Sequence, residues 1–181
     1  MKILIFLQGT TIMPKSGVNK AREEIVEQVK RQGESIRDFG SYVPIGKVVD
    51  KLKKWAEQGA KILYLTSLTE NKKARGDEIV GKEGLKFDQQ ILDKYDFPKG
   101  EIYHREKGEN YAQIAERIMP DILIEDDCES IGGEKEMTIT FIKPEIKEKI
   151  KSIVIKEFGG IDYLPDNLNE LLKYENHNLK K

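Results

Sequence analysis

The sequence predicts a doubly wound α/β fold, in which helices cover both faces of a mainly parallel sheet of about five strands. Two observations lead to this prediction. Short apolar runs alternate along the chain with longer segments of helical periodicity, which is the order typical of such folds. Three of the runs are also almost continuously apolar, as is typical of parallel strands that are buried on both faces. The expected architecture therefore has three layers, α/β/α, and is Rossmann-like in outline.

The predicted strands are the apolar runs themselves. They cover residues 2–7, 61–66, 101–104, 121–125 and 152–156. The first, second and fourth runs (KILIFL, KILYLT and DILIE) are the almost continuously apolar ones. Because ligands of such sheets bind beyond the carboxyl ends of the strands, the residues that follow each run are the first candidates for a site.

Helices are predicted between and after these strands, where apolar residues recur every three or four positions. They cover residues 19–32, 48–58, 87–95, 111–119, 144–149 and 168–174. Gly59 and Pro120 follow two of these segments as stop signals, and Pro144 opens another. We expect one α/β domain over residues 1–165, followed by a C-terminal helix and a polar tail over residues 166–181.

Composition argues against two kinds of partner, nucleic acids and membranes. The chain has 31 basic and 32 acidic residues, so its surface is heavily charged but balanced, and we expect no nucleic-acid partner. No apolar segment is long enough to span a bilayer, and the N-terminal apolar run is too short for a signal peptide, so we expect no membrane partner. The single cysteine, Cys128, favours a cytoplasmic location. A homo-oligomer is compatible with these features.

Four stretches of the chain, in this order, resemble the motifs of the haloacid dehalogenase (HAD) superfamily. Residues 6–10, FLQGT, follow the first motif, Asp-x-Asp-Gly-Thr, in their Gly and Thr, and residues 62–67, ILYLTS, resemble a strand that ends in Thr or Ser. Arg105 and Lys107 lie where the family has a basic residue, and residues 122–127, ILIEDD, resemble its strand with an acidic end. The resemblance covers roughly residues 1–160 and implies a HAD-like fold. It also implies that residues 17–46 form a small cap-like insert.

The resemblance implies a chemistry that this chain has partly lost. In the family, the first aspartate forms an aspartyl phosphate and the second is the general acid and base. Phe6 and Gln8 stand at these positions, so we expect that hydrolysis to be absent. The Gln8 amide can still orient a water or hold a phosphate oxygen. The family binds Mg²⁺ through the first aspartate, a backbone carbonyl and a fourth-motif acid. The Gln8 carbonyl and Asp126 or Asp127 remain, which predicts a weak magnesium site.

The polar residues at the strand ends have two interpretations each. Donors and positive charge for a phosphate group come from Gly9, Thr10, Thr11, Ser67, Arg105 and Lys107. The alternative is ordinary turn chemistry, because Gly, Thr and Ser are common after strands. A divalent cation would be held by Glu125, Asp126 and Asp127, which otherwise form a solvated acidic run.

Further alternatives are a metal set of His104, Glu125 and Asp127, and a nucleophilic Cys128. The nearby carboxylates should raise the pKa of the Cys128 thiol, which opposes formation of the thiolate.

We therefore expect a HAD-like protein that binds a phosphorylated small molecule, a nucleotide or a sugar phosphate, without the family's hydrolysis. One alternative is a metal-dependent phosphatase in which Gln8, Asp126 and Asp127 are the catalytic residues and a bound cation activates water. Another is a non-catalytic interaction or oligomerisation module, in which Phe6 replaces a buried carboxylate and thereby stabilises the core.

Overall fold

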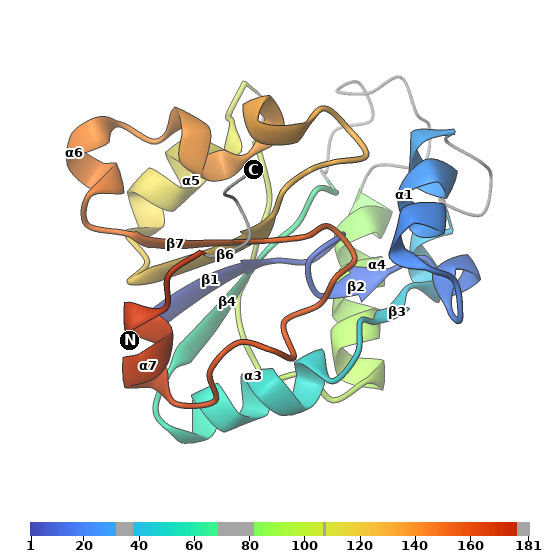
Figure 1. Ribbon diagram of the computed structural model, residues 1–181, viewed down its shortest axis with the longest axis horizontal. Coiled ribbons are helices and arrows are strands. Elements are labelled where there is room, and N and C mark those ends of the chain that lie inside the picture. Colours follow the sequence, from blue (N-terminus) through green and yellow to red (C-terminus); the bar gives the residue numbers. More distant parts are fainter. Residues whose placement is uncertain (32–37, 69–81, 107, 177–181) are drawn as a thin grey trace.

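The computed structural model describes residues 1–31, 38–68, 82–106 and 108–176 (Figure 1). Its centre is a sheet of five parallel strands in the order β5-β4-β1-β6-β7. The strands are β1 (Lys2–Phe6), β4 (Lys61–Leu65), β5 (Ile102–Tyr103), β6 (Ile122–Asp126) and β7 (Lys151–Ile155). This sheet and the helices that flank it confirm the predicted three-layer, Rossmann-like α/β fold.

Side chains that alternate along each strand separate the core into two layers. In β1, Ile3 and Ile5 pack on one face, and Leu4 and Phe6 pack on the other. The first face, which we call the Trp55 face, is covered by α3 (Val48–Glu57), α4 (Lys82–Lys94) and α7 (Leu168–Lys173).

The second face of the sheet, which we call the Ala115 face, is covered by two α-helices and by 3-10 turns. These elements are α5 (Tyr111–Ile118), η3 (Gly133–Glu136), η4 (Thr138–Phe141) and α6 (Pro144–Lys147). Figure 1 shows α5 and α6 above the sheet, with α3 and α7 below it. Helices thus cover both faces, which is why the strands are apolar on both sides.

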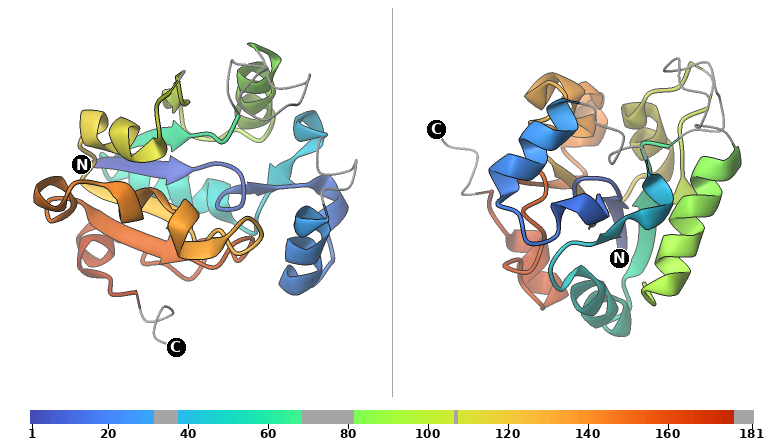
Figure 2. Two further views of the ribbon diagram at one scale, coloured as in Figure 1. Left: turned by 90° about the horizontal axis from the view of Figure 1, so that it is seen from above. Right: turned by 90° about the vertical axis from the view of Figure 1, so that its right-hand side faces the viewer.

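A small second sheet follows β1. Its strands, β2 (Ile12–Met13) and β3 (Val43–Pro44), pair in antiparallel fashion. We call the segment between them, residues 14–42, the insert; its described elements are η1 (Lys15–Gly17), α1 (Arg22–Lys30) and η2 (Phe39–Ser41). Figure 2 shows α1 beyond the carboxyl ends of the strands. Its Ile25 and Val26 pack on Ile45 and Phe158 in a cluster separate from both main core layers.

The element boundaries differ from the predicted ones mainly in the insert and at α4. The predicted helix over residues 19–32 is shorter, and the two-residue strands β2 and β3 are too short to produce a period in the sequence. The helix α4 begins five residues before the predicted 87–95. The sequence did not predict this first turn, because it contains Gly84 and glycine is a poor helix former. Gly84 packs closely against the Leu68 side chain just after β4.

Within the described residues, no helix combines the length and the apolar character that crossing a membrane would require.

Candidate functional site

The carboxyl ends of the five parallel strands bring the candidate residues to one edge of the sheet, which we call the carboxyl edge. In the order of the strands, the residues that follow them are Arg105, Ser67, Gln8, Asp127 and Glu157. Adjacent strands in a sheet are about 4.8 Å apart, so neighbours in this series are close in space. The sequence therefore predicted correctly that the segments after the strands meet at one edge.

Phe6, at the end of β1, places an aromatic ring where the resemblance would require a carboxylate. The residue is 8% exposed and belongs to the Ala115 face. Its ring meets the Tyr111 ring edge-on, with the centroids 4.9 Å apart and the planes at 77°. Such an edge-to-face pair is a favourable packing geometry. Phe6 thus contributes to the core and has no oxygen that could act as a nucleophile.

Gln8 is held in one orientation by hydrogen bonds at both ends of its amide. Its Nε2 donates to Asp88 Oδ1 at 2.8 Å. Its Oε1 accepts from the Ser67 backbone N–H at 2.9 Å and from the Ser67 and Thr66 hydroxyls at 3.1 Å each. The Ser67 N–H can only donate, so it fixes which end of the amide is the oxygen. The predicted site residues Gln8 and Ser67 are therefore in direct contact.

Asp88, on α4, was not predicted as a site residue. It is 1% exposed, and its Oδ2 has no hydrogen-bond partner among the residues that the structure describes. Burial raises the pKa of this carboxyl to about 7, against the opposing effect of its polar neighbours Thr66 and Gln8, of which Gln8 donates a hydrogen bond to it. Its charge also adds to the effect of burial in raising the pKa of Tyr42, so the two side chains are close. One signal was present in the sequence: Asp88 shares the helical spacing of Ile91, Leu92 and Tyr95 and so lies on an apolar stripe.

The threonine hydroxyls in the turn after β1 form hydrogen bonds within the protein. The Thr10 hydroxyl donates to Asp126 Oδ2 at 2.7 Å, and the Thr11 hydroxyl donates to the carbonyls of Phe6 and Leu7 at 3.2 and 3.1 Å. Both threonines are fully buried. These two hydroxyls, predicted to bind phosphate, therefore bind the protein itself.

Gly9 lies between two carboxylates and needs to be a glycine for two reasons. Its φ of 86° is in the left-handed region, which side chains with a Cβ disfavour. A Cβ at this position would lie 2.7 Å from Asp126 Oδ2 and 3.3 Å from Glu157 Cγ. The side chains of Asp126 and Glu157 therefore flank the same point of the backbone.

The three consecutive acids at the end of β6 point in three directions. Glu125 lies on the Ala115 face, where its carboxylate accepts from the Thr138 and Ile139 amides at 2.7 and 2.9 Å. Asp126 accepts from Thr10 and, at 3.0 Å, from the Cys128 amide.

Asp127, the third acid, faces β7 instead. It accepts from Lys156 Nζ at 2.9 Å and from the Glu157 amide at 3.0 Å. Thus Asp126 faces the turn after β1, whereas Asp127 faces the residues that follow β7. Burial raises the pKa of Asp126 to about 6, in spite of its bonds to Thr10 and Cys128.

Glu157 is a second buried carboxyl that was not predicted as a site residue. Its two oxygens accept from the backbone N–H and the hydroxyl of Ser130, at 2.6 Å each. Burial, with a smaller effect from the charge of Asp126, raises its pKa to about 7. Glu157 directly follows the predicted strand 152–156, so its place at the carboxyl edge could have been predicted, but the stretch KEFGG is typical of a turn and does not indicate its burial.

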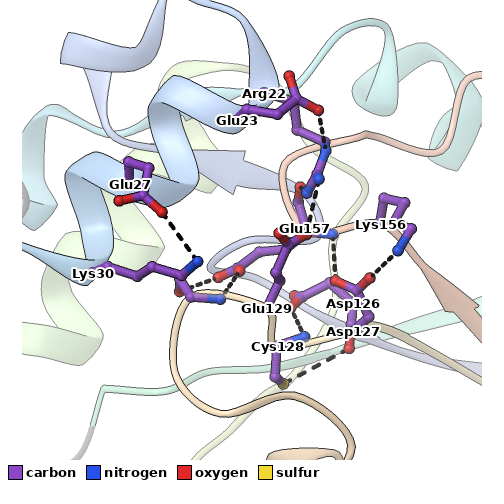
Figure 3. Close-up of polar contacts among 11 residues, drawn as sticks. Arg22, Glu23, Glu27, Lys30, Asp126, Asp127, Cys128, Glu129, Lys156 and Glu157 are labelled. Carbon is purple, nitrogen blue, oxygen red and sulfur yellow. Dashed lines mark hydrogen bonds and ion pairs between the residues drawn. The ribbon is translucent and has the colours of Figure 1, made fainter.

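Arg22 connects the insert to this acidic end of the carboxyl edge (Figure 3). Its Nη2 pairs with Glu129 Oε2 at 2.8 Å, and its Nη1 donates to the Glu157 carbonyl at 3.2 Å. Burial alone would lower the pKa of Arg22, but the bond and the charge of Glu129 outweigh it and raise the pKa. Arg22 therefore stays charged and joins α1 to the loops after β6 and β7.

No group of three or more His, Cys, Asp or Glu side chains in the described parts of the chain is arranged to hold a metal ion. The directions of Glu125, Asp126 and Asp127 explain this, because consecutive strand residues point to opposite faces. In the set of His104, Glu125 and Asp127, the Glu125 carboxylate binds the amides at the start of η4, whereas Asp127 binds Lys156 and the Glu157 amide after β7. The magnesium site stays a prediction.

Arg105 lies at the end of the carboxyl edge that is formed by β5. Its guanidinium carbon is 4.4 Å from the centroid of the Tyr111 ring. Its Nε is buried and has no hydrogen-bond partner among the residues described. Lys107, the other basic residue predicted here, lies outside the described residues. Arg105 thus stacks on Tyr111 at the β5 end of the carboxyl edge, and Ser67 follows the neighbouring strand β4.

Cys128 is half-buried and adopts a φ of 50° after β6. Burial is the main cause that raises the pKa of its thiol, and the carboxylates of Asp126, Glu125, Glu157 and Asp127 add to it. The predicted rise of this pKa is confirmed, with burial as the larger cause. The thiol is thus protonated at neutral pH and is a poor nucleophile.

The sequence was also compared with known proteins: no model of a protein family matches the chain, and neither does any curated protein. The resemblance to the HAD superfamily therefore stays a prediction.

Proposed function

We propose that this protein is HAD-like and binds a phosphorylated small molecule at the β5–β4–β1 end of the carboxyl edge, without hydrolysing it through an aspartyl phosphate. The observation that carries the proposal is Arg105, whose guanidinium is stacked on Tyr111 with its Nε buried and without an acceptor among the described residues. A cytoplasmic location belongs to the same proposal, on the ground of the single cysteine.

An anionic ligand would satisfy Arg105. A buried donor without an acceptor costs about 1–3 kcal/mol. Arg105 is only half-buried, so the rest of its guanidinium can meet a phosphate oxygen, and that contact would offset the cost. A guanidinium is always charged and its planar donors match the geometry of phosphate, while stacking on an aromatic ring holds the plane in place. Ser67 follows the neighbouring strand, so another group of the same ligand could reach it.

The absence of hydrolysis rests on the residues after β1. Phe6 has no nucleophilic oxygen, and Gln8 has an amide that cannot exchange a proton as a carboxyl does. Asp126 has both oxygens engaged, one by Thr10 and one by the Cys128 amide. Phe6 and Gln8 thus supply neither an ionised nucleophile nor a general acid, which supports binding without hydrolysis through an aspartyl phosphate.

Calorimetric titration with inorganic phosphate and with a panel of nucleotides and sugar phosphates tests this proposal. We expect saturable binding of at least one phosphate compound by the wild-type chain and a loss of at least about tenfold in Arg105→Gln, the loss of one charge-assisted contact. Arg117→Gln is the matched control, because Arg117 lies on α5 in an exposed ion pair with Glu109. Binding that survives in Arg105→Gln, or no binding at all, would contradict the proposal.

A further inference from the structure

Asp88 and Gln8 form a hydrogen-bonded pair in which only Asp88 is fully buried. Asp88 is 1% exposed, so a ligand at the carboxyl edge does not reach its oxygens. Gln8 and Ser67, in contrast, are only half-buried at that edge. Asp88 therefore acts on a ligand through Gln8 or not at all.

The hydrogen bonds determine where the protons lie. Asp88 Oδ1 accepts from Gln8 Nε2, which turns Gln8 Oε1 towards β4. That oxygen accepts the Ser67 N–H at 2.9 Å and lies 3.1 Å from the Ser67 hydroxyl. Because an amide oxygen carries no proton, the Ser67 hydroxyl is the donor in this contact. The hydroxyl is left with lone pairs, and a group that approaches it from solvent must supply the proton.

We propose that Asp88 is a positioning residue, which fixes the Gln8 amide so that the Ser67 hydroxyl acts as an acceptor, and that the ligand places a hydroxyl or amino group against it. This inference rests on the proposed function, in which Arg105 binds the phosphate group of the same ligand. The strand order places Ser67 between Arg105 and Gln8, with adjacent strands about 4.8 Å apart. The two contacts suit a small ligand that carries a phosphate group and a hydrogen-bond donor a few atoms away. A phosphorylated polyol, sugar or amino alcohol belongs to this class.

The orientation of Gln8 can be measured without any ligand. In nitrogen–proton NMR spectra of the full chain, the side-chain amide signals of Gln8 are those that disappear in Gln8→Leu. We expect them to shift with pH as Asp88 titrates, to lose this titration in Asp88→Asn, and to move towards free-amide values in Asp88→Leu. Asp88→Asn keeps an oxygen that can accept from Gln8 Nε2, so it should preserve the orientation that Asp88→Leu loses. Gln8 signals that are the same in all three proteins would overturn the inference.

The ligand class is tested with two probes that differ only in hydroxyl groups, glycerol 3-phosphate and propyl phosphate. We expect the wild-type chain to bind glycerol 3-phosphate at least about tenfold more tightly, the value of one good hydrogen bond. Asp88→Leu should lose this preference and keep its affinity for propyl phosphate, whereas Asp88→Asn should retain it. The melting temperature of each variant confirms that it is folded.

The outcomes separate the two proposals. Equal affinity for both probes, with binding lost in Arg105→Gln, would overturn the inference and leave the proposed function standing. If neither probe binds, the ligand class assigned here is wrong, and the proposed function then depends on the wider panel of phosphates. The position of the amide oxygen is decided by the NMR signals in either case.

Discussion

Replacement of Asp88 by asparagine should remove a loss of stability that the wild-type protein suffers as the pH rises above about 4, so the variant should gain more stability at about pH 8 than at about pH 5.5. Asparagine has the shape of the protonated aspartic acid and keeps an oxygen for Gln8 Nε2, but it carries no charge that burial penalises. Asp88 is 1% exposed, so the substitution adds no new contact with solvent.

The magnitude follows from the pKa of Asp88, which burial raises from 3.8 to about 7. Between these values the folded state holds a proton that the unfolded state has released, so the stability falls as the pH rises. From about pH 5.5 to about pH 8, this loss amounts to about 2 kcal/mol for Asp88 alone. In a chain of this size it corresponds to about 4–8 °C in Tm. The loss should be absent from Asp88→Asn.

Urea unfolding of both proteins, followed by circular dichroism at the two pH values, measures the difference. Asp126 and Glu157 also have raised pKa values, but they contribute equally to both proteins, so the comparison isolates Asp88. Asp50→Asn, at an exposed position of α3, is the control and should behave as the wild type. If wild type and Asp88→Asn lose the same stability between the two pH values, the reasoning about Asp88 is refuted.

Further predictions concern the turn after β1 and the chemistry of the edge. Gly9→Ala should lower the free energy of unfolding by at least about 2 kcal/mol, from its positive φ and the clash with Asp126; Gly59→Ala, with a similar φ and nothing within 4 Å, should lose only about 1 kcal/mol. Phe6→Asp should lower it by at least about 3 kcal/mol, and an unchanged melting temperature would show that Phe6 does not support the core. In a phosphatase assay with an aryl phosphate, with magnesium, with manganese and without metal, we expect no turnover above that of Asp126→Asn. Metal-dependent turnover that Asp126→Asn or Asp127→Asn abolishes would establish a metal-activated mechanism instead.

The sheet was predictable from sequence because its strands are buried on both faces and therefore read as unbroken apolar runs, such as residues 62–65. The strand ends then identified Gln8, Ser67, Arg105 and Asp126 as residues of one edge, because all strands are parallel. The small strands β2 and β3 were not predicted, since each has two residues and its pairing depends on a partner about 30 positions away.

The hydrogen-bond partners of the site residues were harder to predict from the sequence. Asp88 lies on a helix, where an acidic residue is normally solvated, and only its place on the apolar stripe indicates burial. The run of Glu125, Asp126 and Asp127 shows the opposite problem, because its pattern suggests a shared site that the structure does not form. Adjacent acids look like one cluster in sequence, yet a strand directs them to different surroundings, and only the structure reveals which donors each one meets.

The β2–β3 pair joins the two ends of the insert, and the Ile45 amide adds a bond to the Thr11 carbonyl at 2.9 Å. The chain that leaves the sheet at Met13 therefore returns at Val43, at a junction that is closed by its own hydrogen bonds. Since the entropy of closing a loop changes slowly with its length, segments of other lengths and sequences could replace the part of the insert before η2 at little expense to the sheet. Phe39 and Tyr42 pack on the Trp55 face and would have to stay. The junction thus makes this part of the insert an exchangeable module, at which the selectivity of the carboxyl edge could be altered while the core stays the same.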